Sequence, residues 1–195
     1  PMAQRSMPSE QMMAADIAPG LNRQVQGFEN LKMHNRTVWQ EIVSEARQRR
    51  TDGLAKLENQ FFGYDSNPDQ IEATLSNFSR AGTGDEVLDA NVQIQSKPFQ
   101  ELWLREKTIK EGGLIICNPP YGERLDELPQ LSPLYNELNE VTRATLPEWG
   151  MAMITGNVDL ARNIRRPLHK KYALYNGAIP CTFLVFNACD ARSMV

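Results

Sequence analysis

Cysteine and histidine are scarce in this 195-residue sequence. The three cysteines, Cys117, Cys181 and Cys189, are odd in number and lack the spacing of zinc ligands, and two of them lie in apolar runs. We interpret them as reduced core thiols. The two histidines, His34 and His169, form no HxxxH pair and no cluster with carboxylates. The sequence therefore predicts neither a disulfide framework nor a metal site.

Long apolar runs are also missing. No run approaches the length of about 20 residues that a membrane-spanning helix requires. The first residues lack the hydrophobic stretch of a signal peptide. The sequence therefore predicts no membrane partner and no export, and together with the reduced thiols this favours a cytoplasmic protein.

The sequence also lacks an excess of positive charge. Lys and Arg number 21 against 24 Asp and Glu, for a net charge of -3, so no positive field surrounds the whole protein. Any nucleic acid would have to be held by local basic clusters. The 41% of hydrophobic residues, with 12 Gly and 12 Pro, exclude disordered, collagen-like and coiled-coil chains. The length fits one globular domain over residues 1–195.

The clearest local pattern is a strand followed by an acidic residue and a helix. An aromatic run at 60–64 ends at Asp65. Asn67 and Pro68 then offer a helix N-cap and a first-position proline, and Gly82 suits the end of that helix. The sequence predicts a helix between these points.

Further strands alternate with helices along the rest of the chain. The LIIC run at 114–117 is typical of a parallel strand covered on both faces. Ser132 and Pro133 indicate the start of a helix that Pro147 ends. The other predicted strands lie at 92–95, 151–155, 171–176 and 181–187. This order predicts an α/β sheet whose last pair of strands forms an antiparallel edge.

The quartet Asn118-Pro119-Pro120-Tyr121 directly follows the LIIC run. In open α/β sheets, ligands bind beyond the C-terminal ends of the strands. The Asn118 side-chain oxygen and a proline carbonyl can accept the two hydrogens of an exocyclic amine, and an aromatic ring can stack on a base. Held in this way, the amine lone pair is aimed at an electrophilic methyl group, so catalysis needs positioning rather than a general base. The alternative is a rigid loop in which Asn118 caps and Tyr121 packs.

Four segments together resemble one known family. They are NPPYGERL at 118–125, FFGYDSNPDQIEATLSNFSRAG at 61–82, MAADIAPGLNR at 13–23 and HKKYALYNGAIPCTFLVFN at 169–187. They resemble, in the same order, the bacterial THUMP-containing methyltransferases that modify guanine N2 in large-subunit ribosomal RNA. The resemblance implies a class I S-adenosylmethionine-dependent methyltransferase domain with a Rossmann-like, seven-stranded α/β sheet.

The resemblance also implies roles for individual residues. Asp65, with Ser66 beside it, matches the acidic position that accepts hydrogen bonds from the ribose hydroxyls of S-adenosylmethionine. A carboxylate at a strand end is also the usual ribose ligand of nucleotide-binding α/β folds, and the alternative is an acid that merely flanks a helix. Glu123 and Arg124 match the continuation of the quartet and would brace the loop or contact RNA, although a surface ion pair is an equal alternative. The catalytic residues implied are Asn118, Pro119, Pro120 and Tyr121.

A basic cluster lies just before the two terminal strands. Its members fall within ten residues: Arg162, Arg165, Arg166, His169, Lys170 and Lys171. Such a cluster suits contacts with the phosphates of RNA, and a solvated loop is the alternative. The predicted substrate-binding residues are therefore Arg124, Arg165, Arg166, Lys170 and Lys171.

The sequence departs from the family in two places. The family has a glycine-rich loop after its first strand that holds the methionine end of the cofactor. This chain begins at Pro1 and has no glycine before Gly20, and its GxG at 82–84 follows a predicted helix. Near Lys97 and Pro98 the carboxylate that relatives often place for the adenine amine is missing. We therefore expect a segment of a longer enzyme, without the first strand, the glycine loop and the THUMP domain, that binds S-adenosylmethionine weakly by itself.

These observations lead to one principal hypothesis and two rivals. The principal hypothesis is methyl transfer from S-adenosylmethionine to guanine N2 of 23S ribosomal RNA. One rival is methylation of adenine N6 in DNA, which related NPPY enzymes perform. The other is a cofactor-free remnant that binds or scaffolds RNA, and calorimetry with S-adenosylmethionine would separate it from an enzyme.

Overall fold

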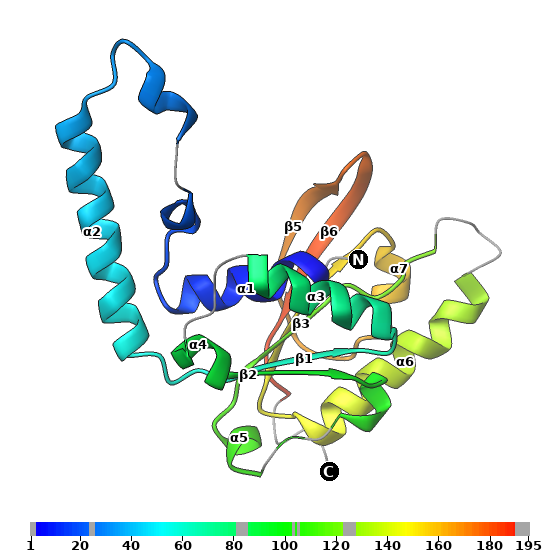
Figure 1. Cartoon of the computed structure of the whole chain (residues 1–195). Helices are drawn as coiled ribbons and strands as arrows, with labels where there is room; N and C mark the ends of the chain where they lie inside the picture. The colour runs from blue at the N-terminus through cyan, green and yellow to red at the C-terminus, as the bar shows by residue number, and fades with distance from the viewer. Residues whose placement is uncertain are drawn as a thin grey trace. The chain divides into compact units, whose positions relative to one another are not determined.

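The computed structural model describes residues 3–23, 26–80, 86–102, 104, 106–122 and 128–189. The chain forms two units, Pro1–Ser96 and Lys97–Val195. The elements of the first unit are α1 (Ala3–Ala14), η1 (Pro19–Asn22), η2 (Gly27–Asn30), α2 (Arg36–Ala55), β1 (Phe61–Asp65), α3 (Pro68–Arg80), α4 (Glu86–Ala90) and β2 (Val92–Ser96) (Figure 1).

A parallel pair of strands forms the sheet of the first unit. Strand β1 pairs with β2 in register from Phe61 opposite Val92 to Asp65 opposite Ser96. The helix predicted after Asp65 is confirmed as α3, because the Asn67 side-chain oxygen accepts a hydrogen bond from the Asp69 amide at 2.9 Å. Helix α1 packs against α3 and β1, and α3 against both strands.

A small apolar core holds the first unit together. Its buried side chains come from the end of α1 and from α4: Met12, Ala15, Ile17 and Leu88. Helix α2 approaches the end of α1 so closely that a Cβ on Gly53 would lie 2.0 Å from the Ala15 carbonyl oxygen. Only glycine fits this helix contact.

The second unit is built on a four-stranded sheet. Its strand order is β3-β4-β6-β5, with β3 and β4 parallel and β6 antiparallel to both β4 and β5. The antiparallel edge predicted from the sequence is therefore confirmed. The elements are η3 (Phe99–Glu101), α5 (Glu106–Lys110), β3 (Leu114–Cys117), α6 (Leu128–Thr145), β4 (Gly150–Thr155), α7 (Val158–Ala161), β5 (Leu168–Asn176) and β6 (Ile179–Phe186) (Figure 1).

One face of this sheet carries the core of the second unit. Side chains of β4 and β6 pack with helices α6 and α7 in a cluster of Tyr135, Leu138, Met151, Met153, Leu160, Ala161, Ile164, Leu184 and Phe186. From β3, Ile115 and Cys117 pack against the same cluster. The core thus fixes the C-terminal ends of the two parallel strands.

Two sequence predictions for this unit are wrong. The LIIC strand is not covered on both faces: Ile115 and Cys117 pack against the core, whereas Leu114 and Ile116, which alternate with them, are 53% and 50% exposed. Helix α6 begins at Leu128 rather than at Ser132, and it contains Pro133. Pro133 has no amide hydrogen, so the helix lacks one backbone hydrogen bond there, the bond that would reach the Pro129 carbonyl.

The α/β class is as predicted, but the count of seven strands is not confirmed. The described residues hold six strands, two in one sheet and four in the other. The GxG at 82–84 lies outside the described residues. Within the described part of the chain, no helix is long and apolar enough to cross a membrane.

Candidate functional site

The quartet predicted from the sequence lies at the C-terminal end of the parallel pair in the second unit. Asn118 and the following residues leave β3 directly after Cys117, which pairs with Met153 of β4. Strand β4 ends at Thr155, so Gly156 leaves the sheet at the same edge. Ligands of open α/β folds bind beyond the C-terminal ends of the strands, which is where both loops begin.

Asn118 presents an unused hydrogen-bond acceptor. Its Oδ1 atom is buried, and no described residue donates a hydrogen bond to it. A buried acceptor without a partner costs about 1–3 kcal/mol, and native proteins rarely retain one without a reason. An N–H group of a ligand would satisfy it. The two prolines that follow, half-buried Pro119 and exposed Pro120, restrict the backbone that carries Asn118.

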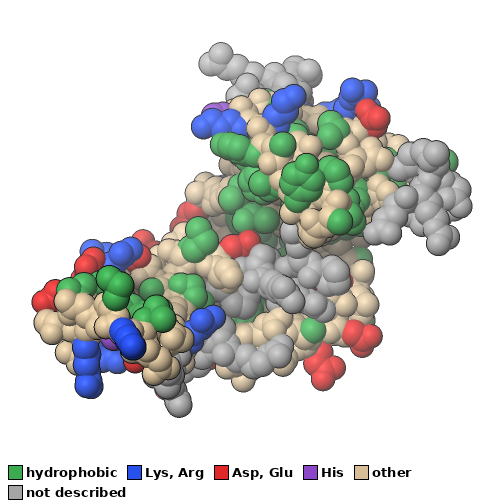
Figure 2. All heavy atoms as spheres, turned by 90° about the horizontal axis from the view of Figure 1, so that it is seen from above, with side chains coloured by type: hydrophobic (Ala, Val, Ile, Leu, Met, Phe, Trp, Pro, Cys, Tyr) green, Lys and Arg blue, Asp and Glu red, His purple; other side chains and the backbone are tan. Residues whose placement is uncertain are grey.

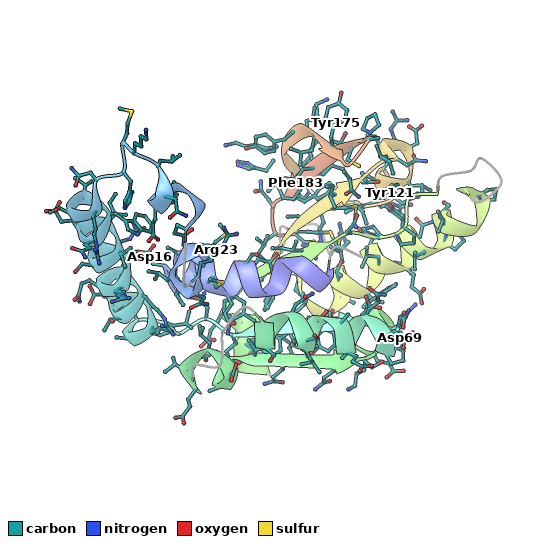
Figure 3. All side chains as sticks on the ribbon, turned by 45° about the horizontal axis from the view of Figure 1, so that its top comes forward. Asp16, Arg23, Asp69, Tyr121, Tyr175 and Phe183 are labelled. Atoms are coloured by element: carbon teal, nitrogen blue, oxygen red, sulfur yellow. The ribbon has the colours of Figure 1, made fainter. Side chains whose placement is uncertain are left out.

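Tyr121 is fixed from two sides. Its hydroxyl accepts a hydrogen bond from Nδ2 of Asn176, at the end of β5, over 3.1 Å. Its ring lies against Gly156, where an added Cβ would come within 2.7 Å of the ring atom Cδ2. Figure 3 shows Tyr121 in the second unit, beside the strands that carry Tyr175 and Phe183. The ring is thereby held in one orientation at the edge of the sheet.

The groups beneath the quartet are neutral. Burial raises the pKa of the Cys117 thiol to about 12, so it stays protonated at neutral pH and is no nucleophile. Burial likewise raises the pKa of Tyr135. The Tyr135 hydroxyl lies 3.4 Å from Oγ1 of Thr155, which accepts a hydrogen bond from the Asn157 amide at 3.0 Å. This arrangement can position a planar polar group, and none of these described side chains is a charged acid or base.

Asp65 and Ser66 lie at the end of β1, in the first unit. Asp65 is half-buried and Ser66 is exposed. Oδ1 of Asp65 accepts a hydrogen bond from the Asn67 amide at 2.9 Å, and no other described residue donates to this carboxylate. Its remaining lone pairs are therefore available to ligand hydroxyls. The residues present fit the ribose of S-adenosylmethionine at this position.

The basic residues divide into two kinds. Arg165, Lys170 and Lys171 are exposed, as phosphate contacts require. Arg166 is only 5% exposed, and its guanidinium donates hydrogen bonds to the carbonyls of Trp149, Thr142 and Leu146. This arginine caps the end of α6 from inside the protein. We therefore withdraw Arg166 from the residues predicted to contact RNA, because its side chain is buried and both terminal nitrogens already donate to interior carbonyls.

Glu123 and Arg124 lie outside the described residues. Among the residues that are described, no group of three or more His, Cys, Asp or Glu could hold a metal ion.

Sequence reasoning missed two residues of the site. Gly156 follows the apolar run of β4 just as Asn118 follows that of β3, so the rule for strand ends could have identified it. Asn176 is 55 residues from Tyr121 in the chain. No local pattern indicates that contact, because it depends on how β5 and β6 pair.

Comparison with protein families gives a match over most of the chain. Residues 10–184 match the family model described as RMKL-like, methyltransferase domain. A curated relative named ribosomal RNA large subunit methyltransferase K/L, from Syntrophotalea carbinolica, is 39% identical over 181 residues, which cover 93% of this chain and 24% of the relative. The protein of the same name from Chromohalobacter salexigens is 37% identical over 182 residues, with the same coverage. The chain thus spans about a quarter of the length of these relatives.

Solved structures agree with this match. The protein SMU.472, described as a methyltransferase and complexed with SAH, superposes with a TM-score of 0.75 at 27% identity, over 93% of this chain and 44% of its own. A protein described as a methylase from Clostridium difficile 630 gives the same score and identity, over 93% of this chain and 45% of its own. The resemblance and the Rossmann-like fold class stated from the sequence are confirmed.

Proposed function

Because the chain belongs to the RMKL-like methyltransferase domain family, we propose that it transfers a methyl group from S-adenosylmethionine to an exocyclic base amine of large-subunit ribosomal RNA. One feature of the site carries the proposal: the buried, unpartnered Oδ1 of Asn118, followed three residues later by the fixed ring of Tyr121. The names of the curated relatives support ribosomal RNA as the substrate, and the SAH complex of a structural relative supports the cofactor.

The residues of the second unit would hold the base. Tyr121 stacks on the base, while Asn118 Oδ1 and a proline carbonyl of the quartet accept the two amine hydrogens. This turns the nitrogen lone pair out of the plane of the ring and stabilises the positive charge that develops on the nitrogen. The target base must leave its stack to reach Tyr121. The excess proton passes from the methylated amine to water, because the groups beneath the quartet are neutral.

The cofactor supplies an electrophilic methyl group. In this proposal Asp65 accepts hydrogen bonds from the two ribose hydroxyls of S-adenosylmethionine, and Ser66 lies beside it. Exposed Arg165, Lys170 and Lys171 contact RNA phosphates. Arg124 stays a prediction for the same role. Both units act in one catalytic domain, and work on ribosomal RNA would place the chain in the cytoplasm.

Guanine N2 is our proposed target, and the nature of the product tests it. We define the extended chain as the 195-residue chain preceded by the strand and glycine-rich loop that the resemblance implies. The extended chain is incubated with isotope-labelled S-adenosylmethionine and large-subunit ribosomal RNA that lacks modifications, and the nucleosides are then separated by mass spectrometry. Labelled N2-methylguanosine is the expected product. Labelled N6-methyladenosine, obtained best with DNA, would indicate the DNA methyltransferase instead, and absence of label would favour a non-catalytic RNA-binding domain.

A further inference from the structure

The hairpin of β5 and β6 lies in a stretch of the chain without negative charge. Residues 160–189 contain no Asp or Glu, although the protein as a whole has a net charge of -3. The stretch includes Lys170 and Lys171 in β5, both exposed. Figure 2, which looks from above, shows a group of hydrophobic side chains with Lys and Arg side chains next to it in the upper part of the view. A surface of this composition is complementary to a polyanion.

Alternation along β5 places four side chains on one face of the hairpin. Their partners in β6 alternate in the same way, from Val185 to Ile179. We call this set the Lys170 row: Lys170, Tyr172, Leu174 and Asn176. Tyr172 is 49% and Leu174 41% exposed, and β5 is the edge strand of its sheet. The row therefore offers a cation, an aromatic ring and an apolar side chain in succession.

The Lys170 row ends at the proposed base site. Its last member, Asn176, donates the hydrogen bond to the hydroxyl of Tyr121. The Tyr172 ring is paired with Phe183 of β6, at 6.4 Å between ring centroids. This pairing limits the movement of an exposed ring that could stack on a base.

Tyr175 offers an internal comparison. It pairs with Pro180 and so lies on the opposite face of β5 from Tyr172, although it is more exposed, at 75%. Figure 3 shows it near the turn of the hairpin. The hairpin therefore carries two exposed tyrosines three residues apart, and only one belongs to the row that leads to Tyr121.

We propose that the Lys170 row binds the single-stranded RNA that flanks the target nucleotide, with Tyr172 stacked on a neighbouring base. This rests on the proposed function. When the target base leaves its stack, the adjacent bases lose a stacking partner, and an aromatic side chain can replace it. Stacking on aromatic rings combined with basic residues is the general mode by which proteins hold single strands. A second copy of the chain that paired at the β5 edge would bring together two hairpins that both lack acidic residues. Their basic residues would repel one another, so RNA fits this surface better than a second copy does.

Binding of a labelled single-stranded RNA oligonucleotide tests the proposal. Its affinity for the 195-residue chain is measured by fluorescence anisotropy, for the wild type and for Tyr172→Leu, Tyr172→Phe and Tyr175→Leu. Leucine keeps an apolar side chain against Phe183 without a stacking ring, and thermal melting checks the fold. We expect Tyr172→Leu to raise the Kd roughly 5- to 150-fold, the range that loss of one stacked base predicts. Tyr172→Phe and Tyr175→Leu should stay close to the wild type.

Several results would overturn this inference. They are wild-type affinity in Tyr172→Leu, equal losses in Tyr172→Leu and Tyr175→Leu, and no RNA binding by the wild-type chain. A Tyr172-dependent dimer in sedimentation, with unchanged RNA affinity, would assign the row to a second copy instead. Failure of the proposed function is distinct: in that case the extended chain transfers no methyl group, whatever the effect of Tyr172→Leu on RNA binding.

Discussion

Tyr121 and Arg166 show how single residues in the second unit obtain different roles from their surroundings. Tyr121 is held by the Asn176 amide at its hydroxyl and by Gly156 against its ring. Arg166 is enclosed by carbonyl groups at the end of α6. In both cases the surroundings of the side chain determine its role, and the residue type alone does not.

Substitution of Gly156 tests the orientation of Tyr121. The backbone of Gly156 does not lie in the left-handed region, so alanine is tolerated by the chain, but its Cβ would overlap the Tyr121 ring. We expect Gly156→Ala in the extended chain to lower the rate of methyl transfer by about 10²-fold, since small displacements of a positioning group have such effects. Gly27→Ala is the control, because among the described residues beyond its two chain neighbours no atom lies within 4 Å of the added Cβ. A wild-type rate in Gly156→Ala would show that the ring orientation is unimportant.

Adjacent arginines test the structural role of Arg166. Arg166→Met removes the donors of three buried carbonyls, and we expect the free energy of unfolding to fall by about 2–5 kcal/mol. Arg165→Met changes an exposed side chain, and it should alter the same quantity by less than about 0.5 kcal/mol. Denaturant unfolding of both variants measures the difference. Equal stabilities would contradict the buried role of Arg166.

At the scale of elements, local signals in the sequence were sufficient for some features and insufficient for others. The start of α3 follows from Asn67 and Pro68, because a cap depends only on its neighbours. The LIIC run marks β3 from Leu114 to Cys117. Its exposure on one face could not be predicted, because the elements that pack on a strand come from distant parts of the chain. The hydrogen bond from Asn176 to Tyr121 and the burial of Arg166 also depend on residues that are far apart in the chain, so no local pattern predicts them.

The exposed basic residues in and just before β5 predict that RNA binding depends on the salt concentration. We expect simultaneous replacement of Arg165, Lys170 and Lys171 by Gln to weaken RNA binding and to flatten its salt dependence. Removing one phosphate-binding cation lowers the slope of log K against log salt by about 0.7–0.9. The matched control replaces three exposed basic residues of the first unit, Arg36, Lys32 and Lys56, by Gln. An unchanged slope in the first variant would place these side chains away from RNA.

At the scale of the whole molecule, the predicted cofactor and base residues lie in different units. Asp65 belongs to the first unit and the quartet from Asn118 to the second, while the family match at 10–184 includes both. The sequence placed both motifs correctly at strand ends, because each follows a short apolar run. The division into two sheets was not expected, since strand pairing joins segments far apart in the chain.

Asp65→Ala tests the role proposed for the first unit. In the extended chain, this change removes a carboxylate that would accept two hydrogen bonds from ribose hydroxyls, at about 1.5–3 kcal/mol each. Calorimetry should show much weaker binding of S-adenosylmethionine, with RNA affinity little changed. Asp69→Ala, in the exposed first turn of α3 (Figure 3), is the matched control. Equal cofactor affinities for Asp65→Ala and the wild type would show that Asp65 only flanks a helix and does not bind the cofactor.

The rate of methyl transfer by Asn118→Ala tests the central claim most directly. It is measured in the extended chain at saturating S-adenosylmethionine and RNA, with Asn30→Ala as an exposed asparagine control. The change removes the unpartnered acceptor of the quartet and leaves the apolar core intact, so the melting temperature and the cofactor affinity should be retained. Our account predicts that transfer is abolished. Near-normal transfer at unchanged stability would contradict the role of Asn118 in holding the amine.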